Sequence, residues 1–95
     1  QQAGAKLLVL ECMPSALAKI ITETVDIPTI GIGAGPDCDG QILVSYDALG
    51  INSGHRRPRF VKDFLAGSGS IDAAFAQYVA DVKTGAFPTV EHGYA

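Results

Sequence analysis

Glu11 occupies the position in this sequence that most strongly suggests chemistry, because it ends the apolar run 7–10 and is followed closely by Pro14. Such a short apolar run is typical of a parallel strand that is buried on both faces. In α/β folds, the C-terminal tips of parallel strands form the edge where ligands bind and reactions take place. A carboxylate has few structural reasons to stand there, so Glu11 is the first candidate for a catalytic role.

Other reactive side chains give weaker signals. Asp47 also follows a predicted strand, but a carboxylate there can cap the next helical turn, and we favour that role over catalysis. Glu91 and His92 are adjacent in the C-terminal tail, and a pair of sequence neighbours does not by itself indicate a site. Cys12 and Cys38 have no metal-binding spacing and make no disulfide framework, which favours reduced thiols in a cytoplasmic protein.

The segment 31–35 carries glycine at alternate positions. This spacing lets a ligand or another part of the backbone come close to one face of a strand. It is not a GxGxxG dinucleotide fingerprint, and Pro36 is poorly placed for the helix that such a motif needs, so a nucleotide site is disfavoured. Close packing at a crowded strand end and direct contact with a ligand both stay open as explanations.

The elements that would position these residues begin with a strand–helix–strand unit. A helix is predicted over 14–26, because proline suits its first turn and apolar residues recur at i, i+3, i+4 and i+8. This stripe consists of Leu17, Ile20, Ile21 and Val25. The helix should end before Pro28, since the residue before a proline is pushed out of the α region. Residues 28–33 then form a second strand, which predicts parallel pairing with the first.

A third strand is predicted over 41–46, and its connection to the second is short. Eight residues, Ala34 to Gln41, are available, whereas a parallel crossover normally takes about a dozen. Eight extended residues span about 27 Å and a five-residue strand about 17 Å, so a parallel return without a full helix is possible. A hairpin is the alternative. Residues 47–54 are predicted as a loop or a short helical turn that Gly50 stops.

Two later helices are predicted over 58–66 and 70–83, the second with the clearer signals. Ser70 suits its N-cap, Asp72 suits the first turn, where the helix dipole favours negative charge, and Gly85 suits its end. The apolar stripe of this helix is typical of core packing and consists of Ile71, Ala74, Phe75, Tyr78, Val79 and Val82. The tail 87–95 is predicted to be irregular.

The composition is apolar for so small a chain. Of its 95 residues 47% are hydrophobic and 18% are charged, against roughly 25% charged in average soluble domains. Small chains need more polar cover, so we expect this one to bury surface against something larger. The net charge of −3 argues against a nucleic-acid surface, and the basic cluster 55–59 is interpreted as a solvated loop and helix start. No signal peptide is visible, and no run approaches the roughly 18 apolar residues of a membrane span.

Several segments in fixed order resemble the C-terminal part of the ketopantoate hydroxymethyltransferase family. The matching stretches are 8–14, 27–36, 38–44 and 47–51, with shorter matches at 60–62, 87–88 and 91–92. The likeness runs nearly from end to end, and the ordered set is specific although no single segment is.

The resemblance implies an α/β fold in which residues 1–95 are the C-terminal segment of one (β/α)₈ TIM barrel. They would supply strands 6–8 plus the C-terminal helices, and strands 1–5 are absent from this sequence. The resemblance also favours the short parallel connection between the second and third predicted strands. Family members use Mg²⁺ and 5,10-methylenetetrahydrofolate to convert 3-methyl-2-oxobutanoate (α-ketoisovalerate) into ketopantoate in pantothenate biosynthesis. They are cytoplasmic homo-oligomers, decamers among them. Their metal-binding acids, substrate-binding lysine and histidine lie on the first five strands, so no metal ligand is expected in this segment.

On this interpretation Glu11 is the general base that removes a proton from the carbon next to the ketone. Burial among Leu10, Ile32 and Val44 would raise its pKa above the usual value of about 4.3. Ile32 and Val44 would be apolar walls around the methyl groups of the substrate. The alternative is a structural or assembly segment that has no activity without the rest of the barrel. Residues 1–95 alone should then neither turn over substrate nor bind Mg²⁺ tightly.

Overall fold

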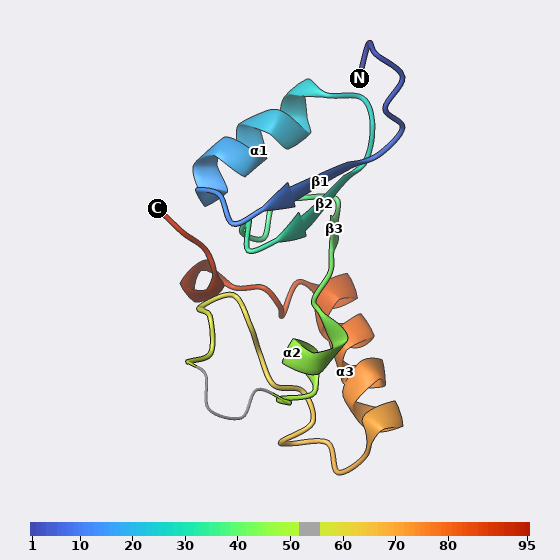
Figure 1. The fold of residues 1–95 in the computed structure, drawn as a ribbon, viewed down its shortest axis with the longest axis vertical. Helices are drawn as coiled ribbons and strands as arrows, with labels where there is room; N and C mark the ends of the chain where they lie inside the picture. The colour runs from blue at the N-terminus through green and yellow to red at the C-terminus, as the bar shows by residue number, and fades with distance from the viewer. Residues whose placement is uncertain (52–55) are drawn as a thin grey trace.

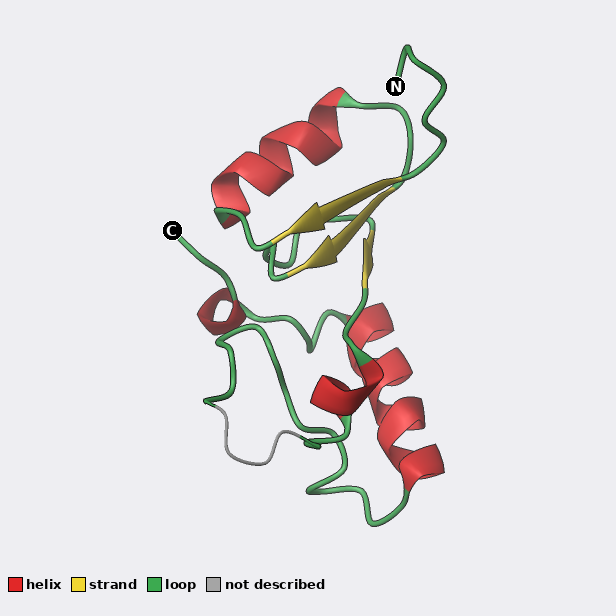
Figure 2. Cartoon of the chain, viewed as in Figure 1, coloured by secondary structure: helices red, strands yellow, loops and turns green. Residues whose placement is uncertain are grey.

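The computed structural model describes residues 1–51 and 56–95. It shows a small parallel sheet with α1 along one face, and α2 and α3 packed together beyond the end of β3 (Figures 1 and 2). The elements are β1 (Leu8–Glu11), α1 (Ser15–Thr24), β2 (Thr29–Ile32), β3 (Gly40–Gln41), α2 (Ser45–Ala48), α3 (Ile71–Thr84) and a 3₁₀ turn (Val90–His92). The prediction of an α/β fold is confirmed. Within the described ranges, no helix is long and apolar enough to cross a membrane.

The strand–helix–strand unit forms as the sequence predicts. β1 and β2 pair in parallel, with Leu8 opposite Thr29 and Glu11 opposite Ile32. Helix α1 packs on one face of this pair through Ala18, which is fully buried and contacts a small core with Leu10. The helix therefore presents its alanine to the sheet, and the outer part of the predicted stripe stays exposed: Leu17 at 46% and Ile20 at 60%.

The short connection between β2 and β3 is parallel, so the hairpin alternative is wrong. The buried Thr29 holds the far end of this connection beside the start of β2. Its backbone N–H donates to Asp39 Oδ2 (2.9 Å), and its Oγ1 accepts from the backbone N–H of Asp39 (3.2 Å). These bonds let eight residues return the chain to the start of β2 without a crossover helix.

The third strand is shorter than the predicted 41–46. Only Gly40 and Gln41 pair with β2, and the backbone N–H of Ile42 adds one bond to the carbonyl of Gly31 (3.0 Å). β2 ends just beyond this point, because Gly33 adopts a left-handed φ of 70° that bends the backbone out of the extended strand conformation. The chain then leaves the sheet and enters α2, which Gly50 (φ 70°) follows, in agreement with the predicted short helical turn.

The prediction of a helix over 58–66 is wrong, because this stretch consists of turns and irregular chain. Asp63 competes with a helical ladder by accepting bonds at Oδ1 from the backbone N–H groups of Leu65 (2.9 Å) and Ala66 (3.2 Å). The backbone N–H of Phe64 donates across the fold to the carbonyl of Ala48 (2.8 Å). Local side-chain bonding and a tertiary bond thus replace the expected helix.

Helix α3 agrees with the prediction at both ends. The hydroxyl of Ser70 accepts from the backbone N–H of Ala73 (3.1 Å), and Gly85 ends the helix in the left-handed conformation. The helix packs on a second core, formed by Ala48, Phe64, Ala74 and Phe87 with Tyr78 at its edge. The hydroxyl of Tyr78 also donates to the carbonyl of Gln41 (2.7 Å), which ties α3 to β3.

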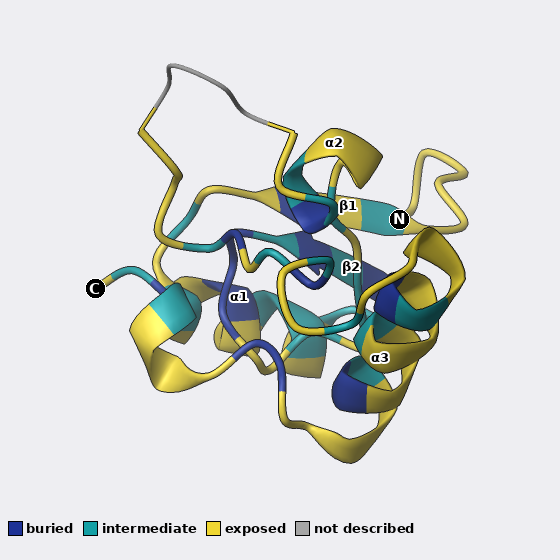
Figure 3. Ribbon diagram, turned by 90° about the horizontal axis from the view of Figure 1, so that it is seen from below, coloured by how far each residue is buried: buried dark blue, intermediate teal, exposed yellow. Residues whose placement is uncertain are grey.

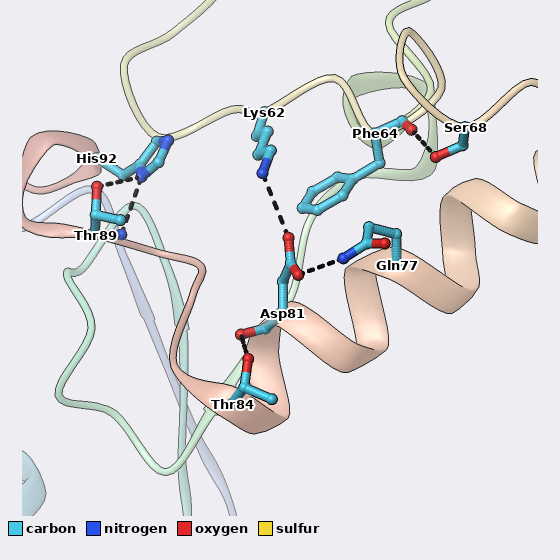
Figure 4. Close-up of polar contacts among 8 residues, drawn as sticks. All are labelled: Lys62, Phe64, Ser68, Gln77, Asp81, Thr84, Thr89 and His92. Carbon is cyan, nitrogen blue, oxygen red and sulfur yellow. Dashed lines mark hydrogen bonds and ion pairs between the residues drawn. The ribbon is translucent and has the colours of Figure 1, made fainter.

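A buried carboxylate on α3 anchors the irregular segment 58–69 (Figure 4). Asp81 is 8% exposed, and it accepts from Lys62 Nζ (3.3 Å) and Gln77 Nε2 (2.6 Å). The ammonium of Lys62 also lies 5.0 Å from the centroid of the Phe64 ring. Charge-assisted bonds of this kind are stronger than neutral ones, so this cluster holds the segment on the helix although the segment has no regular structure.

Candidate active site

The C-terminal edge of the sheet is built by the turns that leave β1 and β2. After Glu11, Cys12 adopts a positive φ of 46°, unusual for a side-chain-bearing residue. Its backbone N–H still donates to the carbonyl of Ile32 (2.9 Å), and that of Met13 donates to the carbonyl of Gly33 (3.2 Å). The main chain therefore fixes the direction in which Glu11 is presented at the tip of β1.

The register places two of the three predicted site residues, Glu11 and Ile32, on one face of the sheet. Glu11 is paired with Ile32, so their side chains point to the same side. Gln41 is paired with Gly31 and therefore lies on the opposite face. Val44 lies beyond the sheet, because β3 ends at Gln41 and Val44 is the N-cap residue of α2. The sheet therefore brings Glu11 and Ile32, but not Val44, to a common face.

This common face is not the one that α1 covers. Leu10 points toward α1 and is 4% exposed, whereas Val9, on the Glu11 face, is 50% exposed, and Val44, beyond the end of β3, is 55% exposed. In Figure 3 the buried residues follow β2 and the inner sides of the helices. Glu11 itself is exposed. The expected burial of Glu11 among Leu10, Ile32 and Val44 is therefore wrong for this structure, because Leu10 faces the other way and the Glu11 face is bare.

The alternate glycines are explained by close packing. A Cβ atom on Gly33 would lie 2.9 Å from Cδ1 of Phe60, and one on Gly31 would lie 3.0 Å from Sγ of Cys38. A Cβ atom on Gly35 would overlap the side chain of Ser15, at the start of α1. These glycines let the segments 12–15 and 60 pack directly against the end of β2.

The remaining sequence candidates do not join Glu11. Asp47 lies within the first turn of α2, where negative charge is favoured, but the N-cap position belongs to Val44. His92 accepts at Nδ1 from the backbone N–H of Thr89 (3.0 Å) and caps the 3₁₀ turn. Burial, helped by the nearby positive charge of Lys62, lowers the pKa of His92 below its usual range. Its role here is structural.

The cysteines and acids offer no metal centre in the described part of the chain. Cys12 is exposed and Cys38 is half-buried, and burial raises the pKa of the Cys38 thiol. Among residues 1–51 and 56–95, no three His, Cys, Asp or Glu side chains come together in a group that could hold a metal ion. The site that these residues form is therefore a single exposed carboxylate beside apolar side chains.

A basic hollow beside this edge was missed by sequence reasoning, which assigned 55–59 to a solvated loop; His55 lies outside the described residues. Arg56, Arg57, Pro58, Arg59 and Tyr94 line an open hollow of about 420 Å³. The signal was present in the sequence, because all three arginines of this acidic chain lie within residues 56–59.

Comparison with known proteins identifies the family. A family model described as ketopantoate hydroxymethyltransferase matches residues 1–90. The chain belongs to this family. Among curated relatives, the 3-methyl-2-oxobutanoate hydroxymethyltransferase of Stenotrophomonas maltophilia (strain R551-3) is 58% identical over 93 residues, and that of Xanthomonas euvesicatoria pv. vesicatoria (strain 85-10) is 59% identical. Each match covers 98% of this chain and 34% of the relative. The chain thus spans about a third of the length of the ketopantoate hydroxymethyltransferases that it resembles.

Proposed function

We propose that this chain is part of an enzyme that transfers a hydroxymethyl group from 5,10-methylenetetrahydrofolate to 3-methyl-2-oxobutanoate, giving ketopantoate. The observation that carries the proposal is the place of Glu11. It stands at the C-terminal tip of a parallel strand, on the same face as Ile32, in a chain that belongs to the corresponding family. That edge is where α/β enzymes carry their catalytic side chains.

In this proposal Glu11 is the general base. Its carboxylate takes the proton from the carbon next to the ketone, and the electron pair of the broken C–H bond moves into the enolate. The enolate carbon then forms a bond with the one-carbon unit, whose bonds to the two folate nitrogens are broken. Water supplies the hydroxyl group and one of the protons that those nitrogens take up, the proton that Glu11 removed accounts for the other, and tetrahydrofolate leaves. Ile32, on the same face as Glu11, and Val44, beyond the end of β3, would pack against the two methyl groups of the 2-oxo acid and orient the C–H bond toward Glu11.

The Mg²⁺ that the family resemblance implies finds no ligand set in the described residues. Mg²⁺ prefers an octahedral shell of oxygen donors, and the described part of the chain holds no group of three or more His, Cys, Asp or Glu side chains that could bind it. We therefore assign the metal-binding residues to another part of the complete protein and give Glu11 the proton transfer alone.

The finer architecture belongs to the same proposal. β1, β2 and β3 would be strands 6, 7 and 8 of a (β/α)₈ barrel, and the bare face of the sheet would point into the barrel. The exposed Val9, Ile42 and Val44 support this reading, since apolar side chains of this kind fill barrel interiors. The complete protein would be a cytoplasmic homo-oligomer, a decamer by analogy with its relatives.

Substitution of Glu11 in the complete enzyme tests the proposal. With Glu11→Gln, deuterium exchange at the carbon next to the ketone should fall by about 10²–10⁴-fold, the usual contribution of a general base. Glu23→Gln is the matched control, because Glu23 is an exposed carboxylate on α1 that pairs weakly with Lys19. If the Glu11→Gln enzyme exchanged deuterium at the wild-type rate, Glu11 would not be the general base.

The second candidate function is a structural segment that is inactive without the rest of the protein. The bare apolar face favours it, because residues on that face lack cover in the described structure. The Glu11→Gln variant of the complete enzyme separates the two functions, because a purely structural segment predicts deuterium exchange at the wild-type rate.

A further inference from the structure

The hollow beside the C-terminal edge concentrates positive charge in a chain whose net charge is −3. Three guanidinium groups, those of Arg56, Arg57 and Arg59, line it together with the ring of Tyr94. Among the described residues, Asp63 pairs with Arg57 at a long distance (3.9 Å), and the Arg57 side chain is 55% exposed. Exposed pairs of this kind contribute little and exchange readily, so the hollow keeps most of its positive charge.

The hollow is fixed to the turns that leave the strands. Arg59 Nη1 donates to the carbonyl of Gly93 (3.3 Å), and its guanidinium lies 5.6 Å from the centroid of the Tyr94 ring. Tyr94 in turn forms a β-bridge with Pro14, and its carbonyl accepts from the backbone N–H of Ser15 (3.0 Å). The basic hollow is therefore attached to the turn that begins at Glu11.

A second contact attaches the same segment to β2. Phe60, the next residue after Arg59, packs against Gly33, where a Cβ atom would lie 3.1 Å from Cγ of the ring. Arg59 and Phe60 thus hold the arginine segment between the turns after β1 and β2. Arg56 and Arg57, which are exposed, project from a segment that the fold anchors at the reactive edge.

The chemistry of the hollow suits a ligand with carboxylates. A guanidinium presents a planar fork of donors that matches a carboxylate with two parallel bonds, and several such forks suit several carboxylates. The hollow is open, so it can hold a flexible chain of charged groups that extends into solvent.

We propose that Arg56, Arg57 and Arg59, with Tyr94, bind the carboxylates of the glutamyl tail of the tetrahydrofolate co-substrate. This assignment rests on the proposed function, which supplies the folate. The one-carbon end of the folate would reach toward Glu11 across the turn 12–15, while the tail stays at the rim. Arg59 also positions Tyr94, so Arg56 and Arg57 are the residues that a test should change.

The test uses the complete enzyme with monoglutamyl and polyglutamyl forms of 5,10-methylenetetrahydrofolate. In the double variant Arg56→Gln/Arg57→Gln, the KM for the polyglutamyl form should rise about tenfold or more, the loss expected for one or two charge-assisted pairs. The KM for the 2-oxo acid and the kcat should stay within about twofold. Lys83→Gln, which removes an exposed positive charge at the end of α3, should leave every constant unchanged, and Arg56→Lys/Arg57→Lys should recover part of the affinity.

Equal rises in KM for the two folate forms, or a rise in KM for the 2-oxo acid instead, would overturn the assignment. Calorimetry of polyglutamyl tetrahydrofolate binding to the complete protein distinguishes failure of the proposed site from failure of the proposed function. A protein that binds the folate through these arginines but does not turn over supports the site and contradicts the activity. A wild-type protein that fails to bind polyglutamyl tetrahydrofolate, or a double variant that binds it as tightly as wild type, contradicts the site.

Discussion

The packing of Gly35 against the start of α1 predicts a large loss of stability on a very small substitution. Gly35 is buried and has a φ of 83°. In Gly35→Ala the new Cβ would lie 2.6 Å from the Cβ of Ser15 and 3.2 Å from its Cα. The second contact is with backbone, so a change of rotamer does not relieve it.

Gly85 provides a matched control for the backbone term. It has the same φ of 83°, and a Cβ atom there would meet nothing within 4 Å. For either glycine, the left-handed conformation costs an alanine about 1–2 kcal/mol, and the stiffer unfolded chain returns about 0.4–1 kcal/mol. Both variants should therefore lose about 1 kcal/mol from this source. Overpacking adds about 1–3 kcal/mol at Gly35 alone.

The expected losses in the free energy of unfolding are thus about 1 kcal/mol for Gly85→Ala and about 2–4 kcal/mol for Gly35→Ala. Urea unfolding of the complete protein measures both, at one protein concentration because oligomers unfold in a concentration-dependent way. A similar shift in midpoint for the two variants, with unchanged m-values, would refute the claim that Ser15 makes Gly35 obligatory.

Three further predictions concern charge. Asp81→Asn should lower the free energy of unfolding by about 1–2 kcal/mol, because it weakens a charge-assisted bond to a partly exposed Lys62. Urea titration measures this loss, and the control Asp72→Asn, on the exposed side of α3, should have a smaller effect. The pKa of His92 is lowered in the folded state. Its contribution to stability is therefore present above about pH 6.5 and is lost as the pH falls through the folded-state pKa. His92→Gln should remove this part of the acid sensitivity, and an unchanged dependence of stability on pH would contradict the prediction. Residues 1–95 expressed alone should give no heat on titration with Mg²⁺ and no turnover, whereas tight stoichiometric binding would show that they form a metal site by themselves.

Sequence reasoning succeeded where local signals and tertiary structure agree. α3 has a capping serine and a terminal glycine, and it forms over Ile71–Thr84, although Ile71, Phe75 and Val79 of its predicted core stripe stay exposed. β1, α1 and β2 also form, but α1 buries Ala18 rather than its predicted apolar stripe. The common face of Glu11 and Ile32 follows from alternation, once the parallel register is known.

The failures have a common physical cause, which is bonding between segments that are distant in the sequence. The stretch 58–66 has a helical apolar pattern, but the backbone of Phe64 bonds to Ala48 and the side chain of Asp63 takes two backbone donors. The third strand stops early because β2 turns away at Gly33. Neither event leaves a mark in the local sequence. The exposure of Glu11 was missed because a strand's pattern does not say which of its faces a helix covers.

The hydrogen bonds between Thr29 and Asp39 have a practical consequence for the engineering of this chain. Since one threonine bonds to the far end of the β2–β3 connection, even a single inserted residue between 33 and 38 would push Asp39 out of reach and shift β3 in its register. The exposed glycines Gly67 and Gly69 offer the opposite situation, because added atoms there meet nothing within 4 Å. Affinity tags, fluorescent labels or permuted chain ends belong at 67–69.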